Sequence, residues 1–137
     1  MDSKKGAGAV IYRENAKGKE YLILHRILGW KGYELAKGGI EEGEDARQAV
    51  KREIGEETGL KKIRLIAGFD RKVGWEKEGR KYDYHYFLVK ADRDEEVRLP
   101  GNIEHDSYEW LPKEEAIKKI THSHIREVLE EAASEDG

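Results

Sequence analysis

Hydrophobic residues recur along the chain in short runs that predict strands around one central helix. The clearest run covers residues 82–91, where side chains alternate between two faces. Residues 20–26 instead carry a continuous apolar run, which is typical of a strand buried on both faces. Further strands are predicted from hydrophobic runs bounded by turn-forming residues, over residues 8–13, 33–35, 63–71 and 107–111.

The central helix is predicted between residues 45 and 59. Asp45 can serve as its N-cap, and Gln48 three residues later can reach back to Asp45 in the manner of a capping box. At the other end, Gly59 can adopt the left-handed conformation that stops a helix. The segment in front of the helix is a glycine-rich loop that begins at Gly38.

The apolar face of this helix becomes acidic towards its end. At about 100° per residue, one face begins with apolar residues and continues into three carboxylates, namely Ala46, Ala49 and Val50 followed by Glu53, Glu56 and Glu57. Like charges at this spacing repel one another. A buried or half-buried group of carboxylates either takes up protons or holds a cation. Hard oxygen donors suit Mg²⁺ or Mn²⁺, and the competing interpretation is a solvated acidic surface.

The rest of the second half is predicted as connections and two further helices. Residues 73–79 are rich in turn-forming residues and are predicted as an irregular connection. A helix is expected over residues 113–120. Thr121 or Ser123 then offers a cap for a last helix that runs through Ala132.

The composition indicates one soluble domain. With 137 residues, the chain is long enough for one hydrophobic core, and an α/β (α+β) sandwich over residues 1–137 is expected. The net charge of -3 gives no basic field for long nucleic acid, and the lack of cysteine excludes disulfides and thiol chemistry. No apolar stretch resembles a signal peptide or a membrane span, which favours a cytoplasmic monomer or homodimer that does not bind membranes.

Residues 38–60 resemble the signature of the Nudix hydrolase family. The match consists of Gly38, five residues, Glu44, seven residues, Arg52-Glu53-Ile54, one residue, Glu56-Glu57, one residue and Gly59-Leu60, and every specified position is filled. The resemblance implies a mixed sheet between helices, an α/β/α sandwich in which this helix covers one face. It also implies hydrolysis of a nucleoside diphosphate linked to another group, with Mg²⁺ held on this helix.

Hydrolysis of a phosphoanhydride needs a metal that neutralises phosphate charge, a positioned water and a stabilised leaving phosphate. Glu53, Glu56 and Glu57 are the expected metal ligands, and the resemblance adds the carbonyl group of Gly38. Glu57 or Glu56 can act as the general base. Some branches of the family use a glutamate outside the signature, for which Glu104 is the candidate here.

Three positions near the signature are expected to support the site. In the family, the arginine pairs with an acid of the signature, and Glu44 is the expected partner of Arg52. Gly59 is expected to end the helix. Lys37 can contact a phosphate oxygen as a point charge, or be an ordinary exposed loop lysine.

The second half of the chain resembles the diadenosine tetraphosphate hydrolases of the animal and archaeal type, a branch of the same family. The similar segments are residues 67–71, 86–89, 104–105, 108–111 and 114–116. On this resemblance, Tyr86 is expected to stack on an adenine. Lys81 and His25 are expected to reach phosphates, and Trp75 occupies the position of a stacking tyrosine.

The predicted reaction is therefore magnesium-dependent hydrolysis of diadenosine tetraphosphate to ATP and AMP. A Nudix pyrophosphohydrolase that acts on an RNA 5′ end or a nucleoside triphosphate remains an alternative. A nucleotide sensor without activity is a further alternative. Sensors of this family typically lose glutamates of the signature, whereas the set is complete here.

Overall fold

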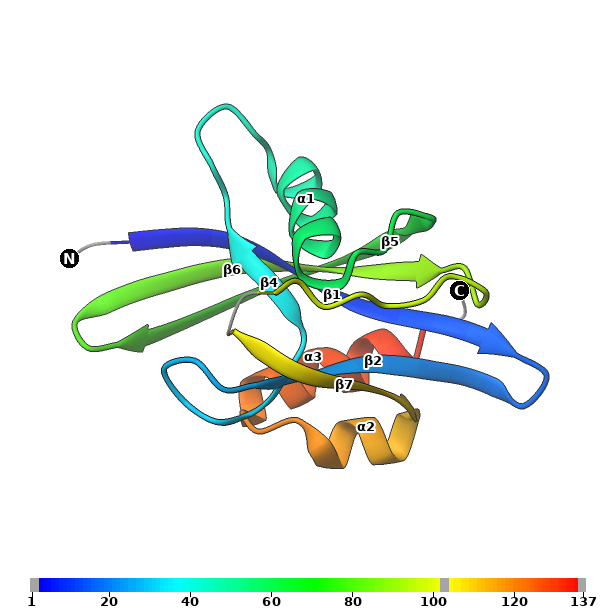
Figure 1. Cartoon of the computed structure of the whole chain (residues 1–137). Helices are drawn as coiled ribbons and strands as arrows, with labels where there is room; N and C mark the ends of the chain where they lie inside the picture. Colours follow the sequence, from blue (N-terminus) through cyan, green and yellow to red (C-terminus); the bar gives the residue numbers. More distant parts are fainter. Residues whose placement is uncertain (1–2, 102–103, 136–137) are drawn as a thin grey trace.

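The computed structural model describes residues 3–101 and 104–135, which form a seven-stranded mixed sheet covered by helices (Figure 1). The strands are β1 (Ser3–Asn15), β2 (Gly18–Arg26), β3 (Gly32–Glu34), β4 (Ala36–Gly39), β5 (Ile63–Lys77), β6 (Arg80–Ala91) and β7 (His105–Pro112). The helices are α1 (Ala46–Thr58), α2 (Lys113–Lys119) and α3 (Ser123–Ala133). Among the described residues, none of these helices has the length and apolar content needed to cross a membrane.

Strand β1 lies in the middle of the sheet, whose order is β3-β2-β1-β6-β5. Strands β1 and β6 are parallel, and the other pairings are antiparallel, so the sheet is mixed as predicted. Strand β7 pairs with the outer side of β2.

The sheet opens between β1 and β2. These strands pair only near their hairpin, through residues 12–15 of β1. Residues 6–9 of β1 pair instead with β4, and residues 24–26 of β2 pair with β3. The segment β3–β4, which leads directly to α1, is therefore held inside the opening. The strand predicted over residues 33–35 is found as β3, which ends at Glu34, and a second short strand, β4, begins at Ala36.

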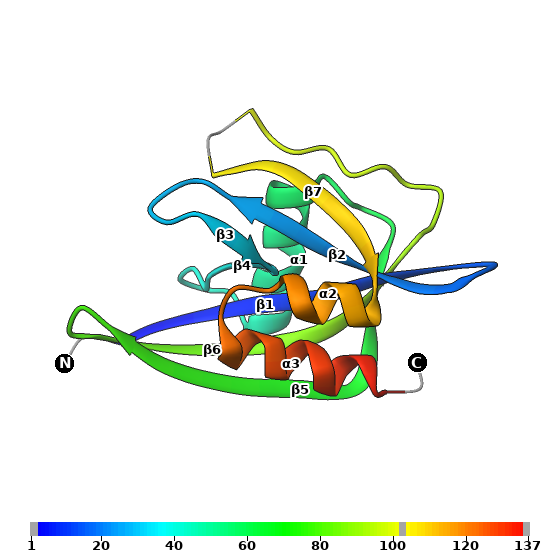
Figure 2. The same cartoon turned by 90° about the horizontal axis from the view of Figure 1, so that it is seen from below.

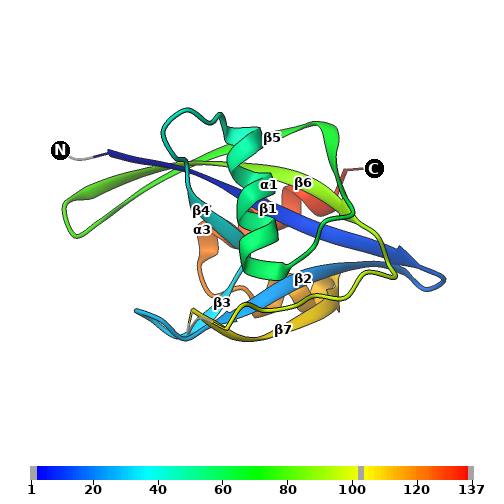
Figure 3. The ribbon, with the colours of Figure 1, turned by 45° about the horizontal axis from the view of Figure 1, so that its top comes forward.

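Hydrophobic clusters on both faces of the sheet fix the helices in two outer layers. Helix α1 packs across β1 and β4 on one face (Figure 3). Its cluster is formed by Ala49, Val50 and Ile54 of α1 with Ala7, Ala9, Ile11, Leu22, Leu24, Phe87 and Val89 of the sheet. Helices α2 and α3 cover the other face (Figure 2). The predicted α/β/α sandwich is confirmed, and the alternating residues of β6 divide between the two clusters.

The connection predicted over residues 73–79 is wrong, because β5 continues through it to Lys77. The turn is confined to Glu78 and Gly79, whose φ angles are 53° and 76°. Positive φ at two successive residues is the geometry of a tight hairpin turn. Val73 is buried against the α3 side of the sheet. This packing stabilises the segment as a strand, although the segment is rich in turn-forming residues.

The predicted caps of the last helix are also wrong. His122 is the N-cap residue of α3, without a hydrogen bond from its side chain to the helix. The hydroxyl oxygen of Thr121 instead accepts a hydrogen bond from the backbone N–H of Tyr33, at 2.8 Å. Thr121 therefore ties the start of α3 to β3, across the sheet opening.

Candidate active site

Helix α1 carries the acidic part of the site and is fixed at both ends. Asp45 and Gln48 form the predicted capping box, with both hydrogen bonds at 2.8 Å. Gly59 ends the helix with φ 74°, as predicted. Because both ends are defined, the angular positions of the side chains on α1 are defined as well.

The glutamates of α1 do not all face inwards. Glu57 is buried, with 6% of its surface exposed, and Glu53 is mostly buried. Glu56 differs, because 58% of its side chain is exposed. Consecutive helical residues lie about 100° apart, so Glu56 lies at the rim when Glu57 faces the sheet. The expectation that three carboxylates share the inward face therefore holds for two of them.

The glycine-rich loop predicted to begin at Gly38 begins later, because Gly38 and Gly39 are the last residues of β4. This end of β4, called the glycine loop below together with residues 40–45, is fitted closely around the carboxylates. A Cβ atom added to Gly38 would lie 2.0–2.3 Å from the carboxyl atoms of Glu53. The backbone N–H of Lys37 donates a hydrogen bond to Oε1 of Glu57, at 3.0 Å. The loop and both inward glutamates are therefore positioned by direct contact.

Arg52 connects the glycine loop to the helix. Its guanidinium donates to Glu44 at 2.7 Å, to the carbonyl oxygen of Gly39 at 2.8 Å and to Glu53 at 2.7 Å. The expected Arg52–Glu44 pair is present. The same guanidinium contacts Glu56 at 3.1 Å, so Arg52 partly neutralises the acidic end of α1 from the outside.

Glu104 joins this cluster from a remote part of the chain. It lies just before β7, and its carbonyl oxygen accepts a hydrogen bond from Ile27. Burial, followed by the nearby charge of Glu104, raises the pKa of Glu57 to about 9. Burial also raises the pKa of Glu53. The two inward glutamates and Glu104 thus form one electrostatic unit.

The donor set of this unit fits a divalent cation. Glu53 and Glu57 supply carboxylate oxygens, which are the ligands that Mg²⁺ and Mn²⁺ prefer, and Glu104 adds a further negative charge nearby. Burial, followed by the charges of Glu104, Glu34 and Glu53, raises the pKa of Glu57, so its carboxylate form is disfavoured without a positive partner. A bound cation would supply that partner.

A second group of polar residues adjoins the cluster and was not found from the sequence. Nε2 of His105 lies 2.6 Å from Oε2 of Glu34, and both side chains are buried. Arg26 bridges Glu34, at 3.1 Å, and Glu104, at 3.0 Å. Burial acts to raise the pKa of Glu34, but His105, Lys37 and Arg26 together bring it below its usual value. Glu34 is therefore a buried anion that helps to orient Arg26 towards Glu104.

The only sequence signal for this group was an isolated charge in a hydrophobic stretch. Glu34 stands between Tyr33 and Leu35, in a strand short enough to be taken for a loop. Glu34, Glu104 and His105 offer ligand atoms within 4.8 Å of one another. Arg26 already bonds both glutamates of this set, so we assign it to positioning rather than to metal binding.

An aromatic cavity of about 750 Å³ lies on the α2/α3 side of the sheet and reaches Glu34 and Lys37. Its rings are Trp30, Tyr33, Trp75, Tyr82, Tyr84, Tyr86, His122 and His124. Trp75 stacks on Tyr82, with ring centroids 5.3 Å apart and planes inclined by 6°. Burial lowers the pKa of His122 and of His124, which favours neutral rings. The cavity therefore offers flat, uncharged surfaces next to a lysine.

Of the residues predicted to contact the substrate, Trp75, Lys37 and Tyr86 line this cavity, whereas His25 and Lys81 do not. Tyr86 is completely buried and packs against Gly8, so its ring has no exposed face for an adenine. His25 pairs with Asp106 at 2.6 Å and is not among the cavity-lining residues.

Lys81 does not line the cavity either, and strand geometry explains its position. Residues of β6 alternate between the faces of the sheet, and Tyr82, Tyr84 and Tyr86 face the cavity. Lys81 therefore points to the opposite face, and it does not line the cavity. The contact of Lys81 with a phosphate therefore stays a prediction.

These features are those of a hydrolase domain that carries its acidic helix on one face of an α/β/α sandwich. The chain belongs to the Nudix family, because the family model described as NUDIX domain matches residues 3–132. It is a Nudix hydrolase.

Curated relatives cover nearly the whole chain. It is 32% identical over 127 residues to the bis(5′-nucleosyl)-tetraphosphatase [asymmetrical] of Caenorhabditis elegans, with 91% of each protein covered. It is 31% identical to the protein of the same name from Sus scrofa, covering 93% of this chain and 91% of that one. It is also 29% identical to an RNA pyrophosphohydrolase of a Nitratiruptor species, covering 84% of this chain and 81% of that one.

Solved structures show the same similarity. A crystal structure titled as a binary complex of C. elegans Ap4A hydrolase superposes with a TM-score of 0.87 at 28% identity, covering 96% of both chains. The MutT protein of Methanosarcina mazei Go1 shares the fold, with a TM-score of 0.77 at 23% identity over 97% of this chain and 94% of that one.

Proposed function

We propose that this protein hydrolyses diadenosine tetraphosphate to ATP and AMP with the help of Mg²⁺ or Mn²⁺. The observation that carries the proposal is that the aromatic cavity and the carboxylate cluster meet at one residue. Lys37 lines the cavity with its side chain and bonds Glu57 with its backbone. An adenine and a neighbouring phosphate can therefore be held at the same time. The asymmetrical tetraphosphatases among the relatives support this choice of substrate.

The nucleoside end of the substrate binds in the aromatic cavity. Trp75 is partly exposed there, and its stacked partner Tyr82 supports it from one side. Nζ of Lys37 lies 5.7 Å from the centre of the Tyr84 ring, so the ammonium is at the cavity wall. It attracts the phosphate next to the bound nucleoside.

The cation would be held by Glu53 and Glu57 together with the carbonyl oxygen of Gly38, and Glu56 is a further candidate at the exposed rim. A divalent cation bound there neutralises phosphate charge and makes a coordinated water more acidic. The raised pKa of Glu57 belongs to the metal-free protein, and a bound cation would restore its carboxylate form.

Glu104 is the proposed general base. Arg26 bonds its carboxylate at 3.0 Å and is itself bonded to the buried Glu34, so the position of Glu104 is well defined. Glu104 accepts a proton from the attacking water as the oxygen of that water bonds to a phosphorus of the bridge. The bond between that phosphorus and the bridging oxygen then breaks, and ATP and AMP are released.

The test is product analysis with Mg²⁺ on a small panel of nucleotides. The panel contains diadenosine tetraphosphate, ADP-ribose, a triphosphorylated RNA 5′ end and the common nucleoside triphosphates. Preferred conversion of diadenosine tetraphosphate to ATP and AMP is expected. Preferred turnover of the RNA end would favour the second candidate, which the relative from Nitratiruptor suggests. Nucleotide binding without turnover would move the protein to the sensor class.

The same assay tests the carboxylate cluster through Glu57→Gln. This variant keeps an acceptor for the N–H of Lys37 but loses the charge, and kcat should fall on the order of a hundredfold or more. Glu130→Gln, an exposed change on α3, is the matched control and should keep normal turnover. Near-normal turnover in Glu57→Gln would contradict the assignment.

A further inference from the structure

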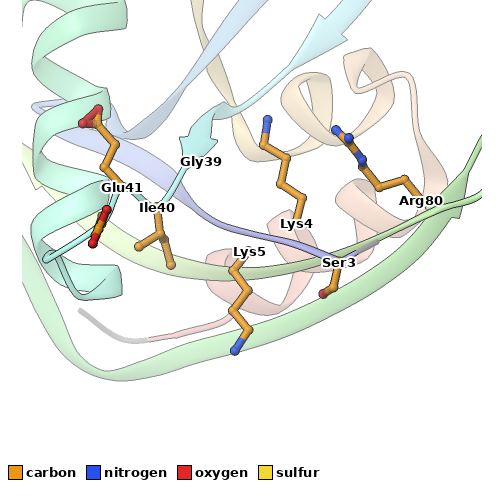
Figure 4. A pocket seen from close by; sticks show the side chains of 8 residues that line it. Ser3, Lys4, Lys5, Gly39, Ile40, Glu41 and Arg80 are labelled. Carbon is orange, nitrogen blue, oxygen red and sulfur yellow. The ribbon is translucent and has the colours of Figure 1, made fainter. Parts of the chain in front are cut away.

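A second cavity, of about 580 Å³, lies beside the glycine loop and contains several cationic side chains (Figure 4). Its lining includes the cations Lys4, Lys5 and Arg80 and the acids Glu41 and Glu42, together with Ser3, Gly39 and Ile40. Lys4 also lines the aromatic cavity. The two cavities therefore meet at Lys4, directly next to the loop that bears Gly38.

Strand register explains why Lys4 and Arg80 face the same way. Lys4 pairs with Tyr82 across the parallel strands β1 and β6, so these two residues lie on the same face of the sheet. Arg80 precedes Tyr82 by two residues and shares that face as well. Figure 4 shows Lys4 and Arg80 pointing to one side of the sheet and Lys5 to the other.

The ammonium group of Lys4 lies against the glycine loop. If Gly39 had a Cβ atom, Cε of Lys4 would lie 3.2 Å from it and Nζ would lie 3.8 Å from it. Within residues 3–101 and 104–135, no acidic side chain forms an ion pair with Lys4. Of the two acids in the lining, Glu41 and Glu42, Glu41 is paired with Arg52 at 3.3 Å.

We propose that Lys4 and Arg80 form an anion subsite for the half of the phosphate chain that extends away from the aromatic cavity. The proposal rests on the proposed function, in which the nucleoside occupies that cavity and the first phosphates pass Lys37. A longer phosphate chain that continues past Gly39 meets Lys4 next and Arg80 beyond it. Lysine serves as a point charge for phosphate, and arginine adds paired donors.

This subsite makes the protein selective for the number of phosphates. A nucleotide with one phosphate reaches only Lys37, so Lys4 contributes nothing to its binding. A chain of three or more phosphates gains the additional contact. Because this contact is made equally in the bound substrate and in the transition state, its loss should raise KM and leave kcat nearly unchanged.

The proposal can be tested with Lys4→Gln, which is exposed and should fold normally. Its KM for diadenosine tetraphosphate should rise about fivefold, the effect expected for one partly screened charge contact. Calorimetry with inorganic tripolyphosphate and Mg²⁺ should show a similar loss of affinity, and the affinity for AMP should not change. The calorimetric arm does not require hydrolysis, so it tests the subsite even if diadenosine tetraphosphate is not the substrate.

Lys118→Gln is the matched control, since it removes the same charge from an exposed residue of α2 that lines neither cavity. Its affinity for tripolyphosphate should equal that of the wild type. Equal affinity of Lys4→Gln and wild type for tripolyphosphate would overturn the proposal. An equal loss in Lys4→Gln and Lys118→Gln would also overturn it, because the effect would then reflect net charge alone.

Discussion

At the scale of single residues, the site depends on a missing methyl group. Gly38 is needed because the carboxyl group of Glu53 fills the space that a Cβ atom would occupy, at 2.0–2.3 Å. The φ angle of Gly38 is not positive, so close approach and not backbone freedom explains this glycine. The neighbouring Gly39 is different, since only the flexible end of Lys4 comes near it, at 3.2 Å.

This contrast gives a matched pair of variants. Gly38→Ala should push the carboxylate of Glu53 out of place and lower kcat on the order of a hundredfold, the effect expected for a displacement of about 1 Å. Gly39→Ala should keep kcat within about twofold of wild type. Steady-state kinetics and a thermal melt distinguish lost activity from lost folding. Equal kcat values for the two variants would contradict the proposed role of Gly38.

At the scale of elements, α1 is a rigid carrier whose ends are fixed by its own sequence. The capping box at Asp45 and the left-handed Gly59 define both ends. Because α1 follows the glycine loop directly, the register of the helix decides which glutamates meet that loop. The buried Val50 and Ile54 then orient Glu53 and Glu57 towards the sheet.

Removing the cap should therefore affect stability more than chemistry. Asp45→Ala loses the bond to the N–H of Gln48 and should lower the free energy of unfolding by about 1 kcal/mol. Asp45→Asn keeps a hydrogen-bond acceptor and should retain most of the wild-type free energy of unfolding. Urea unfolding measures both variants, and kcat at low temperature should remain near the wild-type value. A kcat loss without a stability loss would show that Asp45 acts on the site directly.

At the scale of the whole molecule, the fold brings together polar groups from distant parts of the chain. Gly38 comes from the sheet opening, Glu53 and Glu57 from α1, and Glu104 from the segment before β7. Only the packing of β7 on β2 brings Glu104 close enough to act on Glu57. The result is a folded state that resists full ionisation of its acidic cluster.

This resistance should appear in the pH dependence of stability. Glu57 has a pKa of about 9 in the metal-free fold, above its usual value of 4.5. Between these values the unfolded chain has released a proton that the folded protein retains, so Glu57 makes stability fall as pH rises. In thermal melts with chelator, the melting temperature of Glu57→Gln relative to that of the wild type should rise from about pH 5 to about pH 9. Mg²⁺ should stabilise the wild type most at high pH and Glu57→Gln much less. Parallel melting curves of the two proteins in chelator would contradict this account.

Much of the fold and of the acidic helix could be predicted, because the deciding interactions are local. The alternation of β6 and the caps of α1 follow from spacing along one segment, and the family resemblance implied the pairing of Arg52 with Glu44. The family resemblance then pointed to the glutamates of α1 and to Glu104. The turn-forming residues of β5 led to a wrong prediction, because tertiary contacts hold this segment as a strand.

The sequence alone therefore determined the helix, its acidic residues and the class of hydrolase, since these depend on neighbours in the chain. Only the tertiary structure decided which of those residues face the site. It placed Glu56 at the rim and buried Tyr86 in the core. It also joined Glu34 of β3 to His105 of β7 across β2 and put Lys4 beside Gly39. Burial and long-range strand pairing fix these positions, and neither is a property of a short stretch of sequence.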